Sequence, residues 1–203
     1  MTLRPKLVLL IIFLLSSILS GCVAAVGTGV ISLGLSAAKD KTIGQSIDDS
    51  AISSSIKRSF LVSGFKKLYI RINVEVEKGR VLYTGYVKDD QDILTAIDIA
   101  WKQKGVKEVI NELIVEDSDS KSPYVKDSWI TAQIKTRIFL NRKIKFINYT
   151  IVTNRKTVYI FGFAKSDEEL QEVASIAASI NGVEKVISHV TIKDQDDGIY
   201  PNT

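Results

Sequence analysis

The sequence repeats itself once, and this duplication constrains the fold more than any other feature of the chain. Three short segments return in the same order after 77 or 78 residues: Asp49-Ser50-Ala51-Ile52 as Asp127-Ser128-Trp129-Ile130, Val81–Gly85 as Val158–Gly162, and Gly105-Val106 as Gly182-Val183. Two copies are too few for a solenoid, which needs at least about three stacked repeats. We therefore expect two similar small domains in tandem.

Each copy predicts the order helix, strand, strand, helix, strand. In the first copy, Asp48 or Asp49 is placed to cap a helix whose Ile52, Ile56 and Phe60 form one apolar stripe. Alternating apolar residues then predict a strand at 70–76, and the Lys78-Gly79 turn leads into a strand at 81–87. The last two elements are a helix at 89–104, carrying Ile93, Ile97 and Trp101, and a strand at 108–115.

The second copy repeats this order. Its first helix carries Ile130, Ile134 and Ile138, and it is followed by strands at 149–152 and 158–163, a helix at 167–180 and a strand at 183–192. A copy of roughly 70 residues is small for an independent core, so we expect the two copies to pack on each other. We predict an α+β protein of two tandem αββαβ sandwich domains, each a small mixed sheet with two helices. Gly85 and Gly162 should end equivalent strands, where a Cβ would obstruct a turn or close helix packing.

The first residues have the layout of a secretory signal peptide. Arg4 and Lys6 precede an unbroken apolar run, Leu7–Leu15, which is shorter than the roughly 20 residues that a transmembrane helix needs. Leu19-Ser20-Gly21-Cys22 follows and resembles the bacterial lipobox, in which cleavage precedes a cysteine that carries acyl chains, palmitate among them. The alternative is a plain exported protein with a stray cysteine. Several acyl chains suffice for stable membrane attachment.

These signals divide the chain into six parts. We expect a signal peptide at 1–21, a lipidated Cys22 with a tether at 22–46, domain 1 at 47–116, a linker at 117–125, domain 2 at 126–193 and a polar tail at 194–203. Val23 stands where many lipoproteins that stay in the inner membrane have Asp. By analogy, we expect an outer-membrane location facing the periplasm.

The duplicated unit resembles the BON domain. The strand-ending glycine, the later Gly-Val-x-x-Val, the Ile43-Gly44 to Asp48-Asp49 entry and the segment from Asp127 to Thr131 match lipoproteins with two such domains over essentially the whole mature chain. The resemblance implies a non-enzymatic envelope protein that binds anionic phospholipid and supports outer-membrane integrity, often near division sites. The alternative is a periplasmic scaffold that binds a protein partner in envelope biogenesis.

The chain has little catalytic equipment. His189 is the only histidine and Cys22 the only cysteine, so a zinc site with three or four converging ligands is not expected. No G-x-S-x-G elbow presents a serine nucleophile to His189. We predict no catalytic residues, no metal and no cofactor, with His189 at a surface or strand edge. A sequence pI near 9.0 is compatible with nucleic acid, but export would remove the protein from that partner.

Basic residues concentrate at the start of the second copy. Residues 48–116 carry 11 basic and 11 acidic side chains, whereas residues 126–156 carry eight basic ones against Asp127 alone. The eight are Lys126, Lys135, Arg137, Arg142, Lys143, Lys145, Arg155 and Lys156. Such a concentration attracts anionic lipid at about 1 kcal/mol per basic residue near the surface. A solvated face balanced by the acidic second half of the domain explains the charge equally well.

Trp129 favours the lipid interpretation. With Ile130, Ile134 and Ile138 buried, a period of about 100° per residue places Trp129 on the outer face of its helix. An exposed indole among cations suits the interfacial layer of a bilayer, although Trp129 could instead pack against the linker or domain 1. In the family, the membrane-contacting surface lies on this helix. The predicted lipid-binding residues are Lys126, Trp129, Gln133, Thr136, Arg137 and Leu140, for phosphatidylglycerol or cardiolipin.

Overall fold

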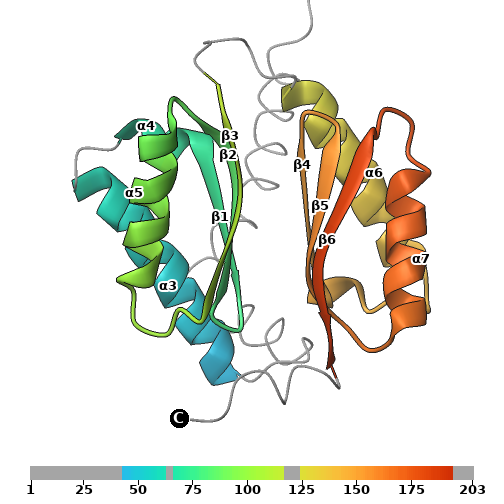
Figure 1. Cartoon of the computed structure of the whole chain (residues 1–203). Helices are drawn as coiled ribbons and strands as arrows, with labels where there is room; N and C mark the ends of the chain where they lie inside the picture. Colours follow the sequence, from blue (N-terminus) through green and yellow to red (C-terminus); the bar gives the residue numbers. More distant parts are fainter. Residues whose placement is uncertain (1–42, 63–65, 117–123, 194–203) are drawn as a thin grey trace, which may run out of the picture.

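The computed structural model describes residues 43–62, 66–116 and 124–193, which form two similar units (Figure 1). Each unit has a three-stranded sheet with helices on one face. The first contains α3 (Ile43–Val62), α4 (Lys66–Arg71), β1 (Ile72–Glu77), β2 (Arg80–Val87), α5 (Asp90–Trp101) and β3 (Glu108–Val115). The second contains α6 (Tyr124–Leu140), η1 (Phe146–Asn148), β4 (Tyr149–Asn154), β5 (Thr157–Ala164), α7 (Asp167–Ala178) and β6 (Lys185–Ile192). The α+β class and the two tandem domains are confirmed.

The two sheets have the same topology. In the first, β2 is central, antiparallel to β1 and parallel to β3, and in the second β5 takes the same place between β4 and β6. The parallel pairs require crossover connections, which α5 and α7 supply. Each mixed sheet therefore has one hairpin edge and one edge strand that arrives from a helix.

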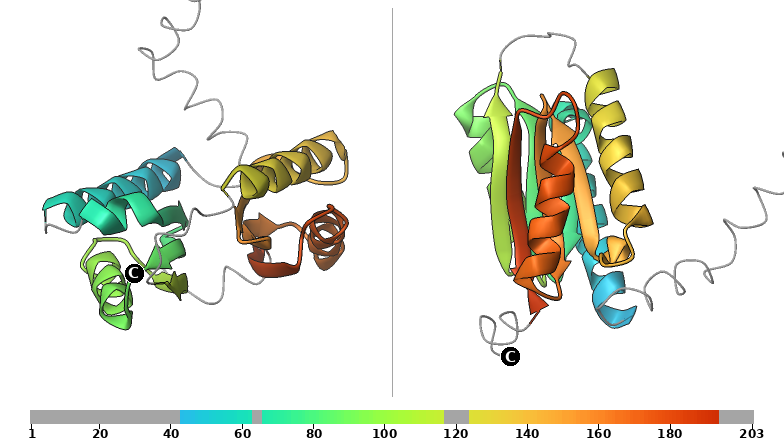
Figure 2. Two further views of the ribbon diagram at one scale, coloured as in Figure 1. Left: turned by 90° about the horizontal axis from the view of Figure 1, so that it is seen from above. Right: turned by 90° about the vertical axis from the view of Figure 1, so that its right-hand side faces the viewer.

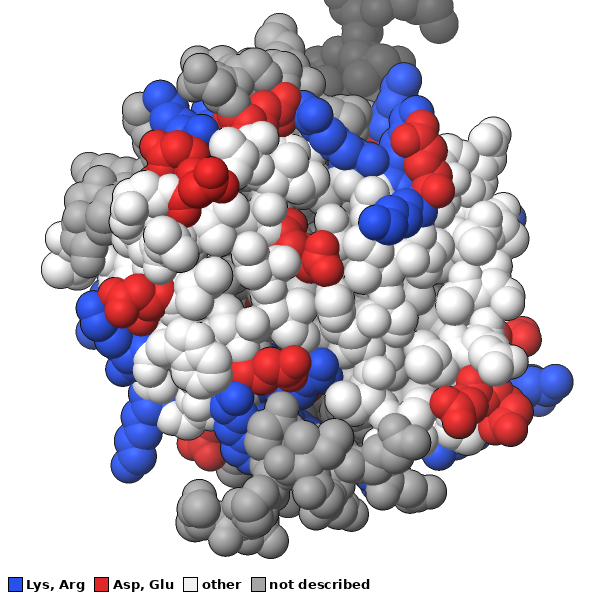
Figure 3. All heavy atoms as spheres, in the orientation of Figure 1, with Lys and Arg blue, Asp and Glu red and all other residues white. Residues whose placement is uncertain are grey.

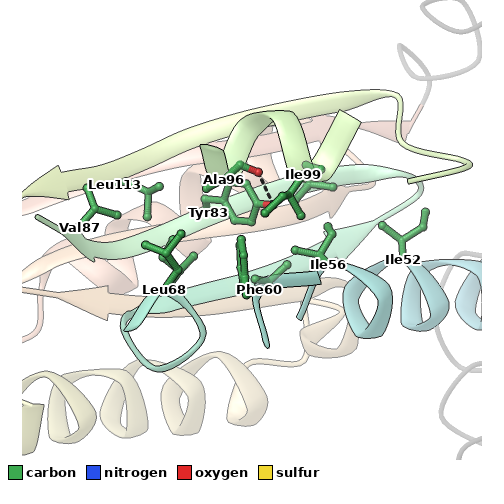
Figure 4. Close-up of a cluster of buried hydrophobic side chains, with 13 residues drawn as sticks. Ile52, Ile56, Phe60, Leu68, Tyr83, Val87, Ala96, Ile99 and Leu113 are labelled. Carbon is green, nitrogen blue, oxygen red and sulfur yellow. Dashed lines mark hydrogen bonds between the residues drawn. The ribbon is translucent and has the colours of Figure 1, made fainter. Parts of the chain in front are cut away.

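The core of domain 1 lies between its sheet and its helices (Figure 4). Ile52, Ile56 and Phe60 form the buried stripe of α3, as the sequence predicts. Tyr83 points from β2 into this core, and its hydroxyl donates to the Ala96 carbonyl of α5 at 3.0 Å. That hydrogen bond satisfies the one polar atom of a fully buried side chain and fixes α5 against the sheet. The equivalent stripe of Ile130, Ile134 and Ile138 is buried in domain 2.

The two sheets pack face to face, with the helices outside (Figure 1). Leu82 of β2 and the β5 pair Tyr159 and Phe161 are buried between the sheets, and the surrounding contacts come from Ile110, Val152 and Ile187. The central strands are therefore covered on both faces, one by their own helices and one by the other domain. This confirms that the two copies pack on each other.

The first helix begins earlier than the sequence suggested. We expected Asp48 or Asp49 to cap it, but α3 starts at Ile43, within the range that we assigned to the tether, and Asp49 lies inside the helix. The Asp49 carboxylate instead accepts hydrogen bonds from the backbone nitrogens of Lys78 and Gly79, at 2.9 and 2.8 Å. Asp49 therefore fastens the β1–β2 turn to α3. In the same way, α6 begins at Tyr124, within the expected linker.

Two further elements of domain 1 differ from the prediction by two residues or more. Ile70 was expected to open a strand, but it lies in α4, and β1 begins at Ile72. The alternation of apolar residues extends back past the start of β1 into α4, a short helix that buries Leu68 and leaves Ile70 exposed. The helix expected at 89–104 spans only Asp90–Trp101, capped by Asp89, whose side chain accepts from the Asp92 nitrogen. Its buried residues are Ala96, Ile99 and Ala100, so Trp101 lies outside the stripe on which it was placed.

Gly85 and Gly162 lie inside β2 and β5 rather than at their ends. Both have positive φ angles, +123° and +130°, which few L-residues adopt. A Cβ on Gly85 would overlap the carbonyl oxygen of Arg71, and one on Gly162 would overlap that of Asn148. The glycines therefore permit the close approach of the chain that enters each sheet, which is neither the turn nor the helix packing that we expected.

Candidate membrane-contacting surface

Two sets of contacts fix helix α6, one made by its buried stripe and one by its first turns. Its buried isoleucines pack on the second sheet, and Asp127, itself 4% exposed, reaches the β4–β5 turn. The Asp127 carboxylate accepts from the backbone nitrogens of Arg155 and Lys156 at 2.8 and 3.0 Å. Asp127 is the counterpart of Asp49 in the second copy, and it fastens the β4–β5 turn to α6 as Asp49 fastens the β1–β2 turn to α3. The outer face of α6 is thereby given a fixed orientation.

Trp129 is 68% exposed, as the helical period predicts. Leu140, on the same outer face, is 71% exposed, and Thr136 is exposed with its hydroxyl turned back to the Ala132 carbonyl at 2.9 Å. Gln133 is half-buried. The Trp129 and Leu140 side chains lie on the exposed face of α6 and do not contribute to the core. They are therefore suited to contact a partner that takes up apolar groups.

Phe139 is an exposed residue of α6 that was not among the predicted lipid-binding residues. It is 69% exposed, next to Leu140, and its ring meets that of Phe146 edge-on with centroids 5.6 Å apart. The signal that could have found it is its position five residues from Ile134, which places it outside the buried stripe. Phe139 and Leu140 together give α6 an apolar end.

The cations around α6 are only partly engaged. Arg155 pairs with Glu116, which raises the pKa of the guanidinium, and Lys156 pairs with Glu184 at 2.5 Å. Arg137 donates to the Ser179 hydroxyl at 3.1 Å. Within the described part of the chain, four other basic residues of the expected cluster form no ion pair: Lys126, Lys135, Arg142 and Lys143. Their charge remains available to an anionic partner.

Polar contacts between the domains fix α6 relative to domain 1. The Arg155 guanidinium stacks over the Tyr86 ring at 5.1 Å from its centroid, and the Tyr86 hydroxyl donates to the Asn154 side chain. At the other side of the interface, Arg80 donates to the His189 carbonyl at 3.1 Å. No sequence pattern predicts these pairs, because each joins residues that only the packing of the sheets brings together.

His189 belongs to this interface. It lies in β6, and its Nε2 atom is 2.8 Å from the Glu112 carboxylate of β3. The described residues contain no group of three or more side chains that could hold a metal ion. None of the described helices is long and apolar enough to span a bilayer. Cys22 and the predicted signal peptide lie outside the described residues.

The BON domain matches this chain twice, at residues 48–117 and 126–194. The chain belongs to the BON domain family. The two matches coincide with the two sheets and their helices, so α3 to β3 form BON domain 1 and α6 to β6 form BON domain 2.

Three curated relatives each match about three quarters of the chain or more. The outer membrane lipoprotein DolP of Haemophilus influenzae is 33% identical over 188 residues, covering 92% of this chain and 96% of its own length. An Anaplasma centrale protein encoded in the gshII 5' region is 40% identical over 72% of this chain and 96% of its own length. The osmotically-inducible protein Y of Escherichia coli is 26% identical over 74% of this chain and 76% of its own length.

Proposed function

We propose that this chain is a non-enzymatic outer-membrane lipoprotein, anchored through acylated Cys22 and facing the periplasm, whose BON domain 2 binds anionic phospholipid through α6. In this role it supports envelope integrity, including at division sites. The likeness to DolP supports the anchor and the location, together with the lipobox that precedes Cys22. The observation that carries the lipid site is the exposed indole of Trp129 on a helix whose Lys126 and Lys135 form no ion pair with a described acid.

The chemistry of the α6 surface fits a bilayer interface. The indole ring of Trp129 is amphipathic and settles at the level of the headgroups, where Leu140 and Phe139 can enter the acyl boundary. Lys126 and Lys135 then lie near the phosphates, each contributing about 1 kcal/mol of attraction. A protein partner would be expected to cover the apolar groups with a shaped surface, whereas a bilayer needs only this amphipathic arrangement.

The chain contains only two tryptophans, and this gives a matched test. Trp101 is 53% exposed on α5, so a Trp101→Phe variant reports only Trp129 and a Trp129→Phe variant reports only Trp101. With vesicles of phosphatidylglycerol or cardiolipin, we expect a blue shift of emission and quenching by brominated acyl chains for Trp129 alone. Neutral phosphatidylcholine vesicles are the lipid control.

Flotation gives the affinity. The chain from Val23 onward lacks Cys22 and therefore any anchor, so its flotation with anionic vesicles measures the site itself. We expect binding that weakens with added salt, because exposed charges are screened, and that falls at least tenfold for Trp129→Ala but not for Trp101→Ala. Equal flotation of both variants would remove α6 from the lipid site. If no variant floats and a protein co-purifies, the scaffold interpretation holds instead.

A further inference from the structure

Both BON domains leave an apolar pair exposed at the end of their first helix. Leu61 and Val62 end α3, at 42% and 81% exposure, and Phe139 and Leu140 end α6, 78 residues later, at 69% and 71%. Neither pair belongs to the buried core of its domain. A single exposed apolar residue is ordinary, but a cluster marks a contact surface. The repetition makes the end of α3 a counterpart of the surface on α6.

Helix α4 enlarges the apolar area of domain 1. It packs Leu68 into the core and leaves Ile70 81% and Tyr69 43% exposed. Domain 2 has no such helix at this position, only the short η1 turn. Domain 1 therefore presents four exposed apolar side chains on neighbouring elements: Leu61, Val62, Tyr69 and Ile70.

The sequence around these residues is mostly basic, although Glu75 lines the same groove as Ile70 and Arg71. Domain 1 has no net charge as a whole, but its residues 50–74 include no acidic side chain and five basic ones: Lys57, Arg58, Lys66, Lys67 and Arg71. The other exposed apolar residues of domain 1 have acidic neighbours in the sequence. Leu94 and Trp101 lie on α5, which carries three aspartates and no basic residue, and Ile114 and Val115 lie between Glu112 and Glu116. The face of the molecule with α5 and α7 shows acidic and basic side chains side by side (Figure 3). Within the described part of domain 1, the exposed apolar residues of the α3–α4 end lie in its most basic stretch of sequence, a combination that fits an anionic membrane.

The packing of the domains places this end on the same side of the molecule as α6. Seen along the sheets, α3 and α6 lie on one side and α5 and α7 on the other (Figure 2). A groove of about 690 Å³ separates α4 from α6, with Ile70 and Arg71 on one wall and Ser128 and Lys135 on the other. The sheet interface holds the two walls together. A flat surface that contacts α6 is therefore within reach of α3 and α4.

We propose that the end of α3 and helix α4 of BON domain 1 form a second contact with anionic phospholipid, on the same face as α6. This proposal rests on the proposed function of α6 and adds that both domains lie on the bilayer. Because the two contacts are joined rigidly, the first to bind raises the effective concentration of the second. Binding is then stronger than either contact alone would give, and the molecule lies with α5 and α7 turned away from the lipid.

Single-cysteine labelling tests this orientation. Because Cys22 is the only cysteine, the chain from Val23 onward can carry one label at a time. The variants are Val62→Cys, Ile70→Cys, Leu140→Cys and, as the control on α5, Leu94→Cys, which replaces a side chain that is 60% exposed. Each is labelled with an environment-sensitive nitrobenzoxadiazole dye and mixed with vesicles of phosphatidylglycerol in phosphatidylcholine, or of phosphatidylcholine alone.

We expect the dyes at positions 62, 70 and 140 to brighten with anionic vesicles and the dye at 94 to stay unchanged. A response at 140 without one at 62 and 70 overturns the second contact and leaves the site on α6 standing. A response at 94 overturns the orientation. No response at any position overturns the site on α6 and this proposal together.

An unlabelled variant checks the same contact without a dye. Val62→Ser combined with Ile70→Ser removes two side chains that are each 81% exposed, so the cores are untouched. We expect flotation to weaken by roughly tenfold, since each side chain loses part of its transfer into the lipid. The matched control is Leu94→Ser, which should float like the wild type. Equal flotation of the double variant and the wild type overturns the proposal.

Discussion

Glu112 of β3 and His189 of β6 occupy the same position in the two repeats, and their side chains meet across the domain interface, with Oε1 2.8 Å from Nε2. Ile110 and Ile187, another equivalent pair, pack in the same contact. Equivalent strands of the two copies thus face each other, the arrangement that twofold symmetry gives a homodimer. The duplicated chain is built like a dimer whose subunits are joined by a linker.

Phe161 offers a test of how much the packing of the two sheets contributes to stability. The Phe161 ring is fully buried between the sheets, and the Arg80 guanidinium lies 5.3 Å from its centroid. Its counterpart in the first copy is Thr84, so the large side chain comes from one domain only. We expect Phe161→Ala to lower the free energy of unfolding by about 3–5 kcal/mol. Urea denaturation followed by circular dichroism measures it.

Phe139→Ala is the matched control for Phe161→Ala. Phe139 is 69% exposed, so its removal should change the free energy of unfolding by less than about 0.5 kcal/mol. If the two variants unfold at the same urea concentration, the sheets do not pack through Phe161 in solution.

The β4–β5 turn offers a stabilising substitution. Lys156 adopts φ +63°, and its counterpart in the first copy is Gly79, at φ +78°. A residue with a side chain costs about 1–2 kcal/mol in the left-handed region, and glycine avoids this cost. Part of that gain is offset, because glycine gives the unfolded chain more conformational entropy. We expect Lys156→Gly to raise the free energy of unfolding by about 0.5–1 kcal/mol. Thermal denaturation of the variant and the wild type provides the comparison.

Lys156→Ala separates backbone from charge at this turn. This variant keeps the strained φ and removes the ion pair with Glu184. The side chains of Lys156 and Glu184 are 45% and 65% exposed, so their ion pair contributes little to stability. The variant should unfold near the wild-type temperature or slightly below it. A gain in Lys156→Ala as large as that in Lys156→Gly would show that the charge, and not the backbone, is responsible.

The sequence predicts the secondary structure and buried residues within each copy, but not the contacts between the two copies. The stripe Ile130, Ile134 and Ile138 is periodic, so the burial of α6 and the exposure of Trp129 follow from it. The interface has a weaker signal: Val158–Phe163 is apolar without alternation, as expected of a strand covered on both faces, but nothing in it names the covering partner. Pairs such as Arg155 with Glu116 depend on that docking and could not be foreseen. The place of Ile70 was missed because its alternation with Ile72 runs on past the true start of β1.

Gly162→Ala should be among the most damaging small substitutions. A Cβ at φ +130° would overlap the Asn148 carbonyl, which is backbone and cannot move without displacing β4. We expect the free energy of unfolding to fall by at least about 4 kcal/mol, a range typical of substitutions that strain the backbone or disrupt the core. The measurement is soluble yield together with urea denaturation. Gly182→Ala is the control, because its Cβ would meet only the end of the Ile130 side chain, at 3.4 Å, and should cost less although its φ is also positive.

The buried hydroxyl of Tyr83 predicts how stability falls at alkaline pH. Burial raises the pKa of Tyr83 well above 10, so the folded protein keeps its proton after the unfolded chain has lost it. The stability from this group is fully present below about pH 10 and is lost as the pH rises beyond it, by about 1.4 kcal/mol per pH unit. Tyr83→Phe loses the hydrogen bond to Ala96, about 1 kcal/mol at neutral pH, but it also loses this alkaline slope. Urea denaturation between pH 8 and about 11.5 should therefore show the variant less stable than the wild type at pH 8, equal to it at roughly pH 10.7 and more stable by about pH 11.5. Parallel curves across that range would mean that the Tyr83 hydroxyl reaches solvent.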